Sequence, residues 1–255
     1  DDDNHAIEQA SQNGHIEIVK LLSCDRRITF FNYNFILLAN RYGHIEIVKM
    51  LLRDKRLKLY DEKNHIINWS CKTNNIDLVK ILLQDKEVDP SNSDNSPIRF
   101  AVVYGNTIIV QLLLQDKRVN PAACDNYSVR KAASNGFTSM LKILLKDNRV
   151  DPRSDNNYAI LKAIRHNYLE TVRILLKDGR IDPSLNKNYA IGLACSQGKL
   201  EIVKLLLKDK RVDPSDNNNY AIEKAIEHDS LSIVKLLIRD KRVIFNKNLN
   251  YFIKL

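Results

Sequence analysis

A short pattern of hydrophobic and polar residues, close to Ile-Glu-Ile-Val-Lys-Leu-Leu, recurs along the whole chain. We take its valine as the marker of each copy. The markers are Val19, Val48, Val79, Val110, Leu141, Val172, Val203 and Val234. The first interval is 29 residues and each of the next six is 31. Eight copies at a nearly constant period indicate a stack of small repeated units rather than ordinary globular domains.

Each copy predicts two short helices separated by a turn. In residues 159–164 the apolar positions recur every three or four residues, which indicates a first helix, and residues 200–207 show the second. Glycine lies five residues before the marker in five copies and suits the turn between the helices. Proline lies eleven residues after the marker in five copies and excludes a continued helix there.

Stacking of the copies is required for stability, because helices of about eight residues do not persist alone in water. A small residue nine positions before the marker lets the first helices approach closely. The members of this column are Ala10, Ala39, Ser70, Ala101, Ala132, Ala163, Ala194 and Ala225. We therefore expect an all-α fold whose leucine columns fill the space between layers.

These residues resemble the ankyrin repeat, in which a β-turn finger precedes two antiparallel helices in about 33 residues. The best local match is Ser-Pro-Ile-Arg-Phe-Ala at 96–101, followed by Gly105 and Val-Gln-Leu-Leu-Leu at 110–114. The resemblance implies a single ankyrin-repeat domain over 1–255. Its expected repeats are 3–32, 33–63, 64–94, 95–125, 126–156, 157–187, 188–218 and 219–249, with 250–255 starting a further repeat or forming a cap.

Two details of the copies refine the resemblance. A period of 31 implies a finger shortened by two residues, with a plain turn at its tip and an asparagine that caps the first helix. The expected capping residues are Asn126, Asn157, Asn188 and Asn219. The recurring Leu-Leu-Lys-Asp-x-Arg-Val-Asp-Pro-Ser and Asn-Tyr-Ala-Ile are similar to ankyrin proteins of giant amoeba-infecting DNA viruses and their hosts.

Catalytic and cofactor motifs are missing from the sequence. The six histidines and four cysteines do not have metal-ligand spacing, and no phosphate-binding loop or nucleophile elbow occurs. His15 and His44 follow the turn glycine and are interpreted as turn or capping residues, while Cys71 and Cys195 share a column expected to be buried. We expect a non-enzymatic monomer without cofactor, metal or membrane span. Its expected location is the cytoplasm, of the host cell for a viral protein, or the nucleus.

The net charge of +9 keeps nucleic acid as an alternative partner, because a basic stripe on a stack could follow a phosphate backbone. Much of the basic excess nevertheless repeats with the scaffold. An arginine recurs after the second helix at Arg27, Arg56, Arg118, Arg149, Arg180, Arg211 and Arg242. Cations near a helix C-terminus are stabilising, so a structural role explains them. The recurring aspartates beside them are interpreted as local ion pairs or turn contacts.

Recognition of a protein partner is expected where the copies differ. The resemblance implies contact through a concave surface built from fingers and first-helix ends, which correspond to the positions seven and six before the marker. The predicted contact residues are Arg41, Tyr42, Lys72, Thr73, Val103, Tyr104, Asn135, Arg165 and His166. Tyrosine and arginine are favoured at interface hot spots. Trp69 and Phe100, earlier on the same helices, are interpreted as core residues because Leu38 and Leu193 share their column.

Overall fold

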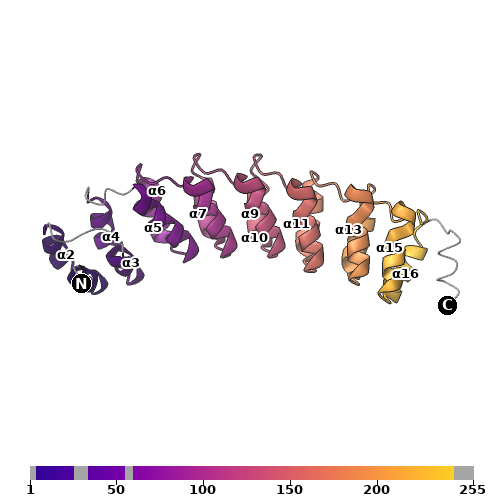
Figure 1. Ribbon diagram of the computed structural model, residues 1–255, viewed down its shortest axis with the longest axis horizontal. Coiled ribbons are helices and arrows are strands. Elements are labelled where there is room, and N and C mark those ends of the chain that lie inside the picture. The colour runs from indigo at the N-terminus through magenta and orange to yellow at the C-terminus, as the bar shows by residue number, and fades with distance from the viewer. Residues whose placement is uncertain (1–3, 26–33, 55–59, 244–255) are drawn as a thin grey trace. The chain divides into compact units, whose positions relative to one another are not determined.

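The computed structural model describes residues 4–25, 34–54 and 60–243, which form paired α-helices and no strand (Figure 1). The chain divides into two compact units, residues 1–119 and 120–255, which we call the N-terminal and C-terminal units. The expected all-α fold is confirmed. The repeat boundaries and the single domain over 1–255 stay predictions. Arg27, Arg56 and the expected start of a ninth copy lie outside the described residues.

Each unit holds four of the helix pairs. Those of the N-terminal unit are α1 (His5–Gln12) and α2 (Ile16–Ser23), α3 (Asn34–Arg41) and α4 (Ile45–Leu52), α5 (Tyr60–Lys72) and α6 (Ile76–Gln84), and α7 (Asn92–Val103) and α8 (Thr107–Leu114). Those of the C-terminal unit are α9 (Ala123–Ser134) and α10 (Thr138–Leu144), α11 (Ser154–Arg165) and α12 (Leu169–Asp178), α13 (Leu185–Ser196) and α14 (Leu200–Leu207), and α15 (Asp216–Glu227) and α16 (Leu231–Ile238).

First helices pack on first helices and second helices on second helices within each unit. Helix α5 contacts α7 and α6 contacts α8, and in the C-terminal unit α11 lies between α9 and α13. All eight members of the small-residue column are buried, as are seven of the eight markers, Val234 being the exception. The predicted stacking surface is therefore the observed core.

The turn between the helices of each pair requires a left-handed residue. The glycine at this place has a positive φ in five copies, as at Gly105 with 76°. In the other three copies the residue is Asn74, Asn167 or Asp229, with φ of 60°, 60° and 52°. Asparagine and aspartate tolerate this conformation better than other residues with a Cβ atom. The turn position is thus defined by its left-handed backbone conformation, and glycine is only the residue that most often occupies it.

A left-handed turn of three residues stands where the finger was expected, as a kink one residue after the start of five of the first helices. It comprises residues 93–95, 124–126, 155–157, 186–188 and 217–219, all with φ between 47° and 67°. Twelve of these fifteen residues are Asn or Asp. The last residue of each turn donates its amide to the carbonyl four residues earlier, as from Asn126 to Ala122 at 2.8 Å. The Asn-rich composition near the start of these five helices therefore has a conformational cause.

Replacement of Asn156 tests this cause, because its side chain is exposed and its φ is 53°. Asn156→Ala is expected to lower the free energy of unfolding by about 1 kcal/mol, since alanine tolerates a left-handed backbone poorly. Asn156→Gly is expected to stay within a few tenths of a kcal/mol of the unmodified chain, because glycine adopts this backbone without strain. Urea unfolding measures both, and an equal loss in the two variants would contradict the conformational explanation.

The asparagine that ends the turn binds the segment after the second helix of its own repeat in three copies, so the expectation that it caps the first helix is wrong for Asn126, Asn157 and Asn188. Asn126 and Asn188 accept hydrogen bonds at Oδ1 from the amides of Asp151 and Asp213, at 2.7 and 2.8 Å. Asn157 instead donates Nδ2 to the carbonyl of Asp182 at 2.8 Å. Each amide thus satisfies a backbone group of the segment that leads into the next repeat, which helix capping would leave unpaired.

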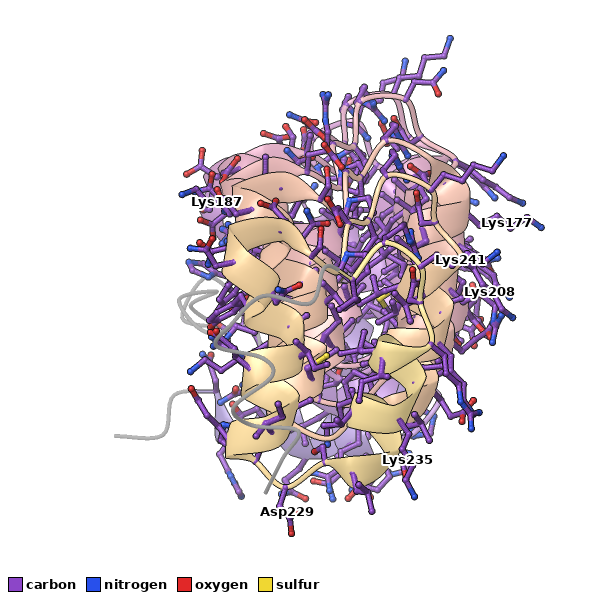
Figure 2. The ribbon with its side chains drawn as sticks, turned by 90° about the vertical axis from the view of Figure 1, so that its right-hand side faces the viewer. Lys177, Lys187, Lys208, Asp229, Lys235 and Lys241 are labelled. Atoms are coloured by element: carbon purple, nitrogen blue, oxygen red, sulfur yellow. The ribbon has the colours of Figure 1, made fainter. Side chains whose placement is uncertain are left out.

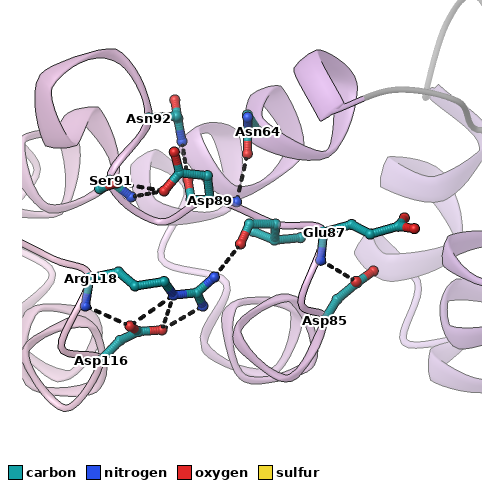
Figure 3. Close-up of polar contacts among 9 residues, drawn as sticks. Asn64, Asp85, Glu87, Asp89, Ser91, Asn92, Asp116 and Arg118 are labelled. Atoms are coloured by element: carbon teal, nitrogen blue, oxygen red, sulfur yellow. Dashed lines mark hydrogen bonds and ion pairs between the residues drawn. The ribbon is translucent and has the colours of Figure 1, made fainter.

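A second polar ladder follows the second helices and explains the arginine column. Figure 3 shows it at Arg118, which binds both carboxylate oxygens of Asp116 and donates Nη1 to the carbonyl of Val88 in the preceding repeat, at 2.8 Å. Arg211 and Arg242 donate in the same way, to Ile181 at 2.8 Å and Val212 at 2.7 Å. The expected ion pairs are confirmed, and the arginines also tie one repeat to the next.

Repeat three lacks this arginine and compensates for it with a lysine. Glu87 stands at the arginine position, and Lys63 on α5 reaches across to Asp85 at 2.8 Å and Glu87 at 2.6 Å. Lys63 is only 4% exposed. Burial by itself lowers the pKa of Lys63, but the bonds to Asp85 and Glu87 outweigh it and raise the pKa above its ordinary value. Lys63 thus remains charged and holds the turn where the arginine is missing.

Candidate functional site

The predicted contact positions lie at the C-terminal ends of the first helices. The residue seven before the marker is the last residue of each first helix, and the next residue directly follows the helix. In the N-terminal unit these ends carry Arg41 and Tyr42 on α3, Lys72 and Thr73 on α5, and Val103 and Tyr104 on α7. We call these six residues, with Trp69 and Phe100, the first-helix face of the N-terminal unit.

Large aromatic side chains are exposed on this face. Tyr42 is 51% exposed, Tyr104 is 48% exposed and Phe100 is 38% exposed, whereas the marker residues beneath them are buried. Arg41, Lys72 and Thr73 are also exposed, and Val103 and Trp69 are half-buried. Exposed tyrosine and phenylalanine beside cations favour partner contact, because a flat apolar ring with a polar edge gains much from burial.

Contacts between neighbouring repeats hold the two tyrosines in place. The Lys72 ammonium lies 5.6 Å from the centre of the Tyr104 ring, a cation–π arrangement between α5 and α7. Gln12 donates Nε2 to the Tyr42 hydroxyl at 3.3 Å. Thr73 donates its hydroxyl to the Trp69 carbonyl at 2.9 Å and so faces its own helix. The structure therefore brings Lys72 and Tyr104 together and positions Tyr42 against the first repeat.

Phe100 corrects one interpretation of the sequence. It was expected in the core with Leu38 and Leu193, but only Leu193 is buried, at 8% exposure, and Leu38 and Trp69 are half-buried. The other copies indicated that this position is exposed, because the same column holds Lys131, Lys162 and Lys224. A column that accepts lysine in three copies faces water, so Phe100 belongs to the surface.

The remaining predicted contact residues belong to the C-terminal unit. Arg165 and His166 are exposed, and the His166 ring stacks on Tyr168 with centroids 5.7 Å apart and planes 28° apart. Asn135 is half-buried, and its Oδ1 accepts a weak hydrogen bond from Ser134 at 3.4 Å. Their position at the first-helix ends follows the prediction, while their part in binding stays a proposal.

His44, Cys71 and Cys195 belong to the scaffold. His44 places Nε2 3.0 Å from the Gln12 carbonyl and makes no capping bond to its own helix, so it is a turn residue. Cys71 and Cys195 are fully buried, as expected, and burial raises the pKa of Cys195 to about 12 and that of Cys71 further still. Over residues 4–25, 34–54 and 60–243, no three His, Cys, Asp or Glu side chains form a group that could hold a metal ion.

The helix pairs, left-handed turns and buried small-residue column are the features to compare with known protein families. A family model described as ankyrin repeats (3 copies) matches residues 35–125, 99–187 and 180–250. Together these matches span residues 35–250, well over half of the chain. The chain belongs to the ankyrin-repeat family. No curated protein matches it. Ankyrin repeats generally serve as protein–protein interaction modules, and the family is typically non-enzymatic.

The helices of this ankyrin-repeat protein are short. None in the described part of the chain is long and apolar enough to cross a membrane. The longest, α5, has 13 residues, against roughly 20 for a membrane-spanning helix.

Proposed function

We propose that the chain is a non-enzymatic scaffold that binds a protein partner through the first-helix face of the N-terminal unit. Arg41, Tyr42, Lys72, Thr73, Val103 and Tyr104 are the proposed contacts there, with Asn135, Arg165 and His166 as further contacts on the C-terminal unit. The observation that carries this proposal is the exposure of Tyr42, Tyr104 and Phe100 at positions that differ between copies, on a framework that is otherwise constant.

Energetic considerations favour protein over nucleic acid at this face. An exposed aromatic ring that becomes buried at an interface centre contributes far more than an exposed cation at the rim. Many of the repeated cations that raise the net charge already bind carboxylates or carbonyls of the scaffold, as Arg118 does. A nucleic-acid partner stays the alternative proposal, because the charge of +9 supports attraction to phosphate.

Affinity capture on the immobilised chain, followed by mass spectrometry with and without nuclease treatment, distinguishes a protein partner from a nucleic-acid partner. A protein retained after nuclease treatment supports the scaffold proposal. Loss of all specific captured material on nuclease treatment, together with tight and steeply salt-dependent binding to nucleic acid, would favour the alternative.

Tyr104→Ala is expected to weaken capture of the partner by at least about tenfold, which corresponds to a hot spot of about 1.4 kcal/mol or more. The melting temperature is expected to change little, because the ring is 48% exposed. Gln111→Ala, an exposed change on the second helix α8, is the matched control and should leave binding unchanged. A Tyr104→Ala chain that binds normally but melts early would assign the ring to the core.

The cellular setting follows from the proposed partner. We propose an intracellular adaptor that acts in the cytoplasm or nucleus, and in the host cell if the similarity to giant-virus ankyrin proteins reflects its source. Its partner would then be a host protein. Expression of the tagged chain in amoebae, followed by cell fractionation and capture, tests this setting.

A further inference from the structure

A groove of about 430 Å³ crosses the second helices of the C-terminal unit, and no first-helix residue lines it. Leu169 on α12, Leu205 on α14 and Leu236 on α16 line it, and all three are half-buried. Its volume is within the range of about 300–1,000 Å³ that is usual for ligand-binding clefts. Water-accessible leucines in a groove contribute binding free energy when an apolar partner covers them.

Cations without an ion-pair partner stand at the edge of this groove. Lys208 and Arg239 line it and make no ion pair within the described residues, and both are exposed. The acidic residues at the groove are already paired with cations of the same unit. Glu201 binds Lys204 at 2.7 Å, and Asp240 is held by Arg242 at 2.6 Å. The available charge at the groove is therefore positive.

The positive charge belongs to a regular array on the second helices of this unit. Each carries a cation one residue and five residues after its marker, and these are Lys142 and Lys146, Arg173 and Lys177, Lys204 and Lys208, and Lys235 and Arg239. Figure 2 shows Lys177, Lys208 and Lys235 on one side and Lys187, of a first-helix turn, on the other. In the N-terminal unit the same columns are mixed and contain Lys20, Lys49, Arg53 and Lys80 but also Cys24, Gln84, Gln111 and Gln115. The array is thus not needed for stacking.

We propose that this groove binds an acidic amphipathic helix of a protein partner, with its leucine-type side chains against Leu169, Leu205 and Leu236 and its carboxylates against Lys208 and Arg239. Apolar and acidic groups on one helix match both properties of the groove. A nucleic-acid backbone would use the cations but leave the leucines uncovered. This surface is separate from the first-helix face and does not depend on the function proposed for that face.

Synthetic peptide probes test the proposal by fluorescence anisotropy at physiological salt with the full chain. The first is a helical peptide of leucine and glutamate with its leucines on one side. The second has lysine for glutamate, and the third has serine for leucine. A single-stranded oligonucleotide of equal charge is the fourth. Only the first is expected to bind measurably. Equal binding of the serine peptide or the oligonucleotide would overturn the proposal, because charge alone would then suffice.

Paired charge reversals locate the binding site. Lys208→Glu with Arg239→Glu is expected to weaken binding of the leucine–glutamate peptide by about tenfold or more. Lys146→Glu with Lys177→Glu changes the same repeat position outside the groove and should weaken it less than about twofold. Equal weakening by both pairs would overturn the proposal. So would sedimentation experiments showing that a second copy of the chain already covers the groove. An unchanged melting temperature of both double variants establishes that each chain is folded.

Discussion

Leu144→Ala is expected to lower the free energy of unfolding by about 2–5 kcal/mol, as buried leucine truncations do. Leu144 is fully buried on α10, in the layer between neighbouring repeats. A single repeat cannot fold alone, so a cavity in this layer weakens the contacts that hold adjacent helix pairs together. A loss near the top of this range is expected if the surrounding helices cannot move into the space.

Urea unfolding monitored by circular dichroism measures the Leu144→Ala effect. Leu231→Ala is the matched control, because Leu231 is 60% exposed at the start of α16. The control is expected to change the free energy of unfolding by less than about 0.5 kcal/mol. An unaltered midpoint for Leu144→Ala, or equal losses in both variants, would contradict the stacked core.

Acid is expected to cause the other large loss of stability, because the repeat places a carboxylate with a lowered pKa in one copy after another. In the described residues the pKa lies below its ordinary value for Asp85, Asp116, Asp147, Asp151, Asp182, Asp209 and Asp240. For five of them, Asp85 and Asp182 excepted, the largest cause is the hydrogen bond from the arginine two residues later.

The sign of the pH dependence follows from these directions. A carboxyl with a lower pKa in the folded chain binds fewer protons than it does unfolded. Its contribution to stability is complete above the ordinary aspartate pKa of 3.8 and is lost as the pH falls through the folded-state value. With seven such groups, the loss below about pH 4 should be steeper than the roughly 1.4 kcal/mol per pH unit that one proton gives.

Unfolding measured from pH 7 to pH 3 tests the acid effect. Asp116→Asn with Asp209→Asn is expected to reduce the stability at pH 7 and to flatten the decrease in acid, because two of the titrating groups are gone. Glu17→Gln is a control outside the ladder, since this glutamate pairs with the exposed Lys20 at 2.6 Å. A stability that stays constant between pH 6 and pH 3 would refute the role assigned to the aspartate ladder.

The ends of the first helices at the candidate site could be predicted from the sequence. The positions seven and six before each marker were predicted to end the first helices, and they do so in all eight copies. This succeeded because a glycine-type turn and a helical period are both local signals that repetition reinforces. Phe100 was placed wrongly, since a single phenylalanine carries no sign of the direction it faces. Comparison with Lys131 and Lys162 in the same column would have corrected it.

By itself, the sequence determined the period, the helix pairs, the buried columns and the family, because each depends on spacing within one repeat and is written eight times. Tertiary structure decided the long-range polar contacts, within and between repeats. Only the folded chain shows that Asn126 binds Asp151, that Arg118 reaches Val88, and that Lys63 replaces a missing arginine. The side-chain partners lie 22 to 30 residues apart, a distance at which the spacing of residue types does not specify which donor meets which acceptor.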